Sequence, residues 1–146
     1  MYVSSFLKIS AVIFITWGVA YIFAGGLLLN ADAAIAINGF TGSANPDLLP
    51  VGYPDAIGGL VNHHGWTLIW FGAAVILGAV YILTNNLTAI WMTALIVALV
   101  EFGYFLFMGQ GSLVTVLPAN VITSMAILAI VLCLIAYIPS RRMYVS

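Results

Sequence analysis

Glu101 is the residue of this sequence whose type and position most strongly suggest a chemical role. It is the one acidic residue inside an apolar run at 87–108. A carboxyl group deep in a membrane costs about 2.5–3.5 kcal/mol on insertion scales and usually faces protein or a wet cavity. We therefore expect a partner for Glu101 on another helix or another chain. The simplest form of this expectation is a neutral carboxyl group that hydrogen-bonds Tyr104, Asn120 or a histidine.

The adjacent residues His63 and His64 raise the hypothesis of a metal site, with Asp55 upstream. Imidazole and carboxylate ligands suit zinc, copper or iron. A divalent transition metal held by His63, His64, Glu101 and Asp55 is therefore one interpretation. Neighbouring residues on a helix point about 100° apart, so both histidines reach one ion only where the backbone is irregular, as the glycine at Gly65 would permit. The alternative is that the two histidines cap a helix at the membrane surface.

Other chemistries find little support in the sequence. The single cysteine, Cys133, excludes an intrachain disulfide and any CxxC redox or zinc motif. Ser112 and Ser124 have no nearby base that would make either a nucleophile. With three basic residues in the whole chain there is no patch that would bind nucleic acid. The sequence therefore leans away from an enzyme and leaves that question open.

The composition defines where the protein resides. The chain has 146 residues, of which 64% are hydrophobic and 5% are charged, and its mean hydropathy is +1.21. Soluble domains carry about 25% charged residues. Because so few charges cannot cover a water-exposed surface, the sequence predicts an integral membrane protein.

Four apolar runs are long enough to cross a bilayer, which takes roughly 20 residues per helix. A tight turn around Asn85 makes the second and third of them an antiparallel hairpin. The sequence predicts an all-α, single-domain, four-helix transmembrane bundle, with helices at about 6–29, 66–84, 87–108 and 115–138.

The basic residues predict the orientation. Lys8, Arg141 and Arg142 all lie beside the chain ends, and cytoplasmic segments carry the excess of Lys and Arg. Both termini should therefore be cytoplasmic (N-in/C-in), in a plasma or inner membrane. The loops at 30–65 and 109–114 should face outward.

The loop at 30–65 is the largest predicted segment outside the membrane. Structureless loops longer than about 12–15 residues are uncommon and usually functional or disordered. This loop carries many apolar residues, so we expect it to fold down as a cap over the outer end of the bundle. The histidines stand at its end, and polar groups concentrate in this outer half.

Small residues predict which way Glu101 faces. Ala94, Ala98 and Glu101 share one face of the third predicted helix by their spacing. Small residues four apart let membrane helices approach closely. We therefore expect Glu101 to point into a helix–helix interface.

Three classes of function remain. The first is a small accessory or structural subunit of a larger membrane complex, packing by its apolar helices and capping the outer side with the loop at 30–65. The second is a membrane enzyme or metal-binding protein using His63, His64 and Glu101. The third is an oligomeric proton or ion transporter using Glu101. The expected partners are bound membrane lipids, and other membrane subunits or further copies of the chain, but no nucleic acid.

Overall fold

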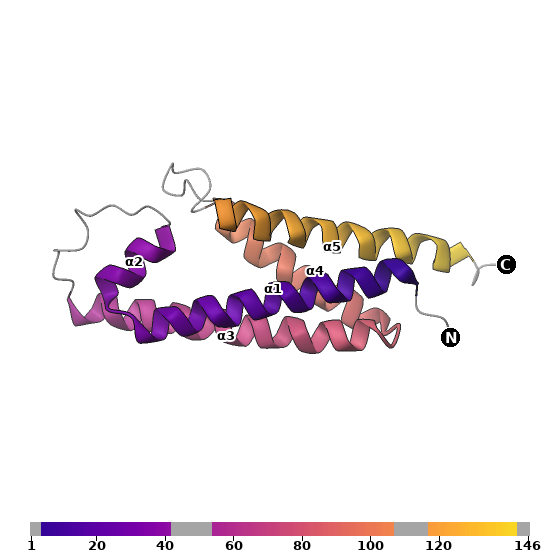
Figure 1. Cartoon of the computed structure of the whole chain (residues 1–146). Helices are drawn as coiled ribbons and strands as arrows, with labels where there is room; N and C mark the ends of the chain where they lie inside the picture. The colour runs from indigo at the N-terminus through magenta and orange to yellow at the C-terminus, as the bar shows by residue number, and fades with distance from the viewer. Residues whose placement is uncertain (1–3, 42–53, 107–116, 143–146) are drawn as a thin grey trace.

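Five helices form the part of the chain described by the computed structural model, which covers residues 4–41, 54–106 and 117–142, with side chains at 4–37, 54–106 and 121–137. Within these ranges the structure contains no strand, so the all-α prediction is confirmed. The helices are α1 (Ser5–Asn30), α2 (Ala33–Thr41), α3 (Asp55–Ile82), α4 (Leu87–Tyr104) and α5 (Leu117–Arg142) (Figure 1).

Three of these helices, α1, α3 and α4, are long and apolar enough to cross a membrane. In α5 the described apolar stretch, Val121–Tyr137, is slightly shorter. The chain therefore has the helices of a membrane protein, as its composition predicts.

The four long helices pack around a shared apolar core. α1 and α3 run side by side in opposite directions and make the most extensive contact, while α5 lies along another face of α1 and α4 packs between α3 and α5 (Figure 1). The largest fully buried side chains come from all four helices: Phe14, Trp17, Val75, Ile82, Val97 and Cys133. The short α2 folds back onto the start of α3.

Glycines bring α1 and α3 into close contact. A Cβ atom placed on Gly18 would lie 2.7 Å from the carbonyl oxygen of Gly72, and one placed on Gly65 would lie 2.9 Å from that of Gly25. Gly18 and Gly25 are seven residues apart on α1, and Gly65 and Gly72 are seven residues apart on α3. Each pair therefore falls on one stripe of its helix. Only residues without a side chain permit this backbone contact, which is typical of membrane helices.

The turn between α3 and α4 is as tight as the sequence predicts. Asn85 adopts a positive φ of 57°, a conformation that asparagine tolerates better than most residues. The side chain of Asn86 then accepts a hydrogen bond from the backbone N–H of Ala89 at 3.0 Å and so caps the N-terminus of α4.

The segment predicted as a loop at 30–65 is largely helical where it is described. After a break at Ala31, where the backbone is extended, Asp32 accepts a hydrogen bond from the N–H of Ala34 and starts α2. Helix α3 begins at Asp55 rather than at residue 66, just after Pro54 and with an acidic residue in its first turn, where the helix dipole favours it. Residues 42–53 lie outside the described part.

Candidate functional site

The carboxyl group of Glu101 is the centre of a buried hydrogen-bonded cluster. The side chain is only 6% exposed. Its Oε1 accepts hydrogen bonds from Trp17 Nε1 at 2.7 Å and from the Tyr21 hydroxyl at 3.0 Å, and its Oε2 accepts one from the Thr123 hydroxyl at 2.5 Å. These three donors, with Glu101, form what we call the Glu101 cluster. It ties α4 to both α1 and α5.

Helix α1 positions two of the three donors together. Trp17 and Tyr21 are four residues apart and therefore neighbours on one helix face. Their rings stack, with centroids 3.7 Å apart and an angle of 21° between the planes. Trp17 is fully buried. The stacking directs the indole N–H and the phenol O–H at the same carboxyl oxygen.

Glu101 belongs to the row of buried residues on α4 that faces the interior of the bundle. Ala94, Val97 and Glu101 are all buried, and Thr93, next to Ala94, lies against Gly78 of α3. In the structure, Glu101 thus lies at the interface of α4 with α1. Hydrophobic residues cover the opposite face of this helix.

The cluster can hold Glu101 in either protonation form. An indole N–H only donates, whereas a hydroxyl group both donates and accepts. An ionised Glu101 accepts all three bonds. A neutral Glu101 can donate its own proton to the hydroxyl of Tyr21 or Thr123 while Trp17 keeps donating to Oε1.

The donors differ from the partners that the sequence suggested. Tyr104 is close enough to Glu101 for an electrostatic interaction, but the three bonds come from other helices. The side chain of Asn120 lies outside the described part. Sequence reasoning missed Trp17, Tyr21 and Thr123. The spacing of two aromatic residues with polar tips on one face of α1 was the available signal.

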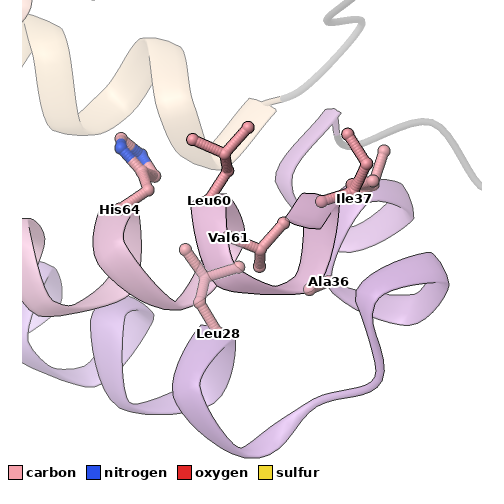
Figure 2. A pocket seen from close by; sticks show the side chains of 7 residues that line it. Leu28, Ala36, Ile37, Leu60, Val61 and His64 are labelled. Atoms are coloured by element: carbon pink, nitrogen blue, oxygen red, sulfur yellow. The ribbon is translucent and has the colours of Figure 1, made fainter. Parts of the chain in front are cut away.

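The two histidines lie in another part of the structure. They belong to a regular stretch of α3, so their side chains diverge, with His63 exposed and His64 half-buried. His64 lines an apolar pocket together with Leu28 of α1 (Figure 2). Leu28 is about 10 Å further along α1 than Tyr21 by the helical rise. The histidines are therefore at a different level of the bundle from the Glu101 cluster.

The predicted metal site gains no support from this arrangement. Asp55 stands about two turns before His63 on the same helix, and Glu101 is engaged elsewhere. Across the described residues, no group of three or more His, Cys, Asp or Glu side chains is placed to hold a metal ion.

A second polar contact joins α1 to α5. The buried Ser10 hydroxyl donates to the carbonyl oxygen of Ala129 at 2.7 Å, and Cys133 Sγ lies 2.9 Å from the Ser10 oxygen. Because the one hydroxyl proton goes to the carbonyl group, the thiol is the donor in the second bond. This contact is a packing feature and leaves Cys133 fully buried.

No protein-family model, no curated protein and no solved structure matches this chain.

Proposed function

We propose that the chain is a four-span membrane bundle with both termini in the cytoplasm. α5 serves as the fourth span, completed by residues on either side of its apolar stretch. The start of α1 and the end of α5 lie at the same end of the bundle (Figure 1), near Lys8, Arg141 and Arg142. The positive-inside rule assigns that end to the cytoplasm of a plasma or inner membrane.

The other end of the bundle then faces outward. α3 has 28 residues and is about 42 Å long, which exceeds the roughly 30 Å of the hydrocarbon core. The excess length favours a position of Asp55 and the two histidines near the outer interface. Together with α2 they supply part of the outer cap.

We further propose that the chain acts as a small accessory or structural subunit of a larger membrane complex. The observation that carries this is the Glu101 cluster, in which donors of the same chain occupy both carboxyl oxygens of Glu101. Such a cluster fixes α1, α4 and α5 relative to each other. The lipid-facing surfaces are left to large apolar side chains, among them Leu95, Leu99 and Phe102 of α4, which suit contact with lipid and with other membrane helices.

The test is the composition of the material that binds to the chain in its native membrane. The full-length chain, tagged at its C-terminus, is extracted in a mild detergent and captured, and the captured proteins are quantified by mass spectrometry. The proposal expects other membrane proteins at a fixed ratio to this chain. A preparation that holds only this chain, as monomer or homo-oligomer, contradicts it.

A second candidate is an oligomeric proton or ion transporter that uses Glu101. One observation favours it, namely that the hydroxyl groups of Tyr21 and Thr123 lie within hydrogen-bond distance of Glu101 and can pass on a proton. Proton flux into vesicles that contain the chain, abolished by Glu101→Gln, would support this candidate. For a membrane enzyme or metal-binding protein, the described residues offer no comparable observation.

A further inference from the structure

An apolar pocket lies at the end of the bundle where α2 folds back on α1 and α3. It measures about 220 Å³. Figure 2 shows its wall, with Leu28 coming from α1, Ala36 and Ile37 from α2, and Leu60, Val61 and His64 from α3. The lining is mostly aliphatic, and His64 is the one lining residue with a polar side chain.

The chemistry of the wall selects a hydrocarbon ligand. A buried water needs two to four polar partners, and an apolar cavity of about 150 Å³ stays dry and takes up benzene or xenon. This pocket is larger than that, is partly open to the outside, and is lined mostly by aliphatic side chains. A ligand with polar groups inside the pocket would lose its hydrogen bonds with water and gain none, which is unfavourable.

The helices around the pocket indicate where a hydrocarbon ligand would come from. The pocket is lined by α1 and α3, two of the helices that are long and apolar enough to cross a membrane. Leu60, which lines the pocket, exposes 65% of its surface. Apolar side chains therefore continue from the pocket to the outside of the bundle. We propose that the pocket holds part of one acyl chain of a membrane lipid, which enters over Leu60.

This proposal predicts a retained lipid that depends on the free volume of the pocket. The full-length chain is reconstituted in vesicles of phosphatidylcholine and phosphatidylglycerol, extracted in a mild detergent, and weighed by native mass spectrometry. The unchanged chain should keep one lipid that dissociates last. Val61→Phe and Ile57→Trp, the second at a further lining residue from α3, enlarge side chains in the wall and should each lose that lipid.

Two controls separate pocket binding from general lipid contact. Leu95→Phe adds the same ring on an exposed position of α4 and should keep the lipid. Near-ultraviolet circular dichroism, to which the stacked Trp17–Tyr21 pair contributes, shows whether each variant is folded. Dodecane added to the unchanged chain tests the same point without a substitution, because it should compete for the pocket and lower the retained lipid at least twofold.

Three results would overturn the proposal. The first is equal lipid retention by the folded pocket variants, Leu95→Phe and the unchanged chain. The second is retained mass that corresponds to detergent alone. The third is lipid retention that dodecane leaves unchanged. None of these results bears on whether the chain has protein partners.

Discussion

Glu101 shows how a single polar residue can be kept inside an apolar bundle. A buried charge or acid without partners is strongly destabilising, and here each carboxyl oxygen has at least one donor. The donors also restrict one another, because Trp17 and Tyr21 stack. The same contacts that satisfy the carboxyl group therefore specify how α1, α4 and α5 fit together.

Replacing Glu101 should distinguish the shape of the side chain from its hydrogen bonds. In Glu101→Gln the amide oxygen still accepts from Trp17 and Tyr21, and the amide N–H can donate to the Thr123 oxygen, so the yield and the thermal midpoint should stay near normal. Glu101→Ala leaves three donors without their acceptor, at about 1–3 kcal/mol each, and should lower both. The measurement is size-exclusion chromatography of detergent extracts after heating. Equal tolerance of the two changes would contradict the cluster.

Thr123 and Glu101 should be energetically coupled. Thr123→Val removes the hydroxyl group at nearly constant shape, so its cost should shrink when Glu101 is already alanine. Groups in direct contact show coupling energies of about 0.5–3 kcal/mol. A double-mutant cycle on reversible unfolding in mixed micelles measures this term. Thr67→Val is the matched control, because the Thr67 hydroxyl donates to the His63 carbonyl oxygen of its own helix. Coupling of Thr123 no larger than that of Thr67 would contradict the model.

For Glu101, the sequence predicts that hydrogen-bond partners are needed but does not identify them. The cost of a buried carboxyl group indicates that Glu101 must have partners, and the small residues of α4 indicate the direction in which it points. The partners themselves are 84 residues away at Trp17 and 22 residues away at Thr123. Their pairing depends on how the helices are assembled, which local spacing does not encode.

The contact between α1 and α3 depends on glycine at specific positions. Gly18→Ala would place a methyl group 2.7 Å from the carbonyl oxygen of Gly72 and 2.7 Å from a side-chain carbon of Ile76, which forces the helices apart. We expect a loss of about 1–3 kcal/mol, as for other overpacked sites, measured as reversible unfolding in mixed micelles.

Gly26→Ala is the control on the same helix. A methyl group there meets nothing within 4 Å, so its effect should be neutral or stabilising by up to about 1 kcal/mol through helix propensity. Equal destabilisation by the two alanines would show that the close approach does not hold α1 to α3.

The helices differ in how well the sequence predicts them. The apolar length predicts α1 and α4 well, and asparagine chemistry predicts the turn before α4. The start of α3 was predicted too late, because Gly58, Gly59 and the polar residues near His63 are weak helix formers. In the structure Leu68 and Val61 of this helix pack against Leu28 and Ala36. This tertiary packing outweighs the local preference.

The whole molecule should have both ends on one side of the membrane. A green fluorescent protein fused to either terminus should fluoresce in a bacterial host, and a periplasm-dependent phosphatase fused to either terminus should be inactive. The physical reason is the placement of Lys8, Arg141 and Arg142 beside the ends of the chain. Phosphatase activity at one terminus only would mean an odd number of spans and would exclude the proposed four.

The mass of the native particle tests most directly whether this chain is a subunit of something larger. The chain itself is 15.6 kDa. Extracted from its own membrane in a mild detergent and measured by light scattering with the detergent contribution subtracted, the particle should have a protein mass well above that value and not an integer multiple of it. Dissociation in a harsh detergent should release chains of other sizes. A particle whose protein mass equals one chain, or a whole number of identical chains, would contradict the account.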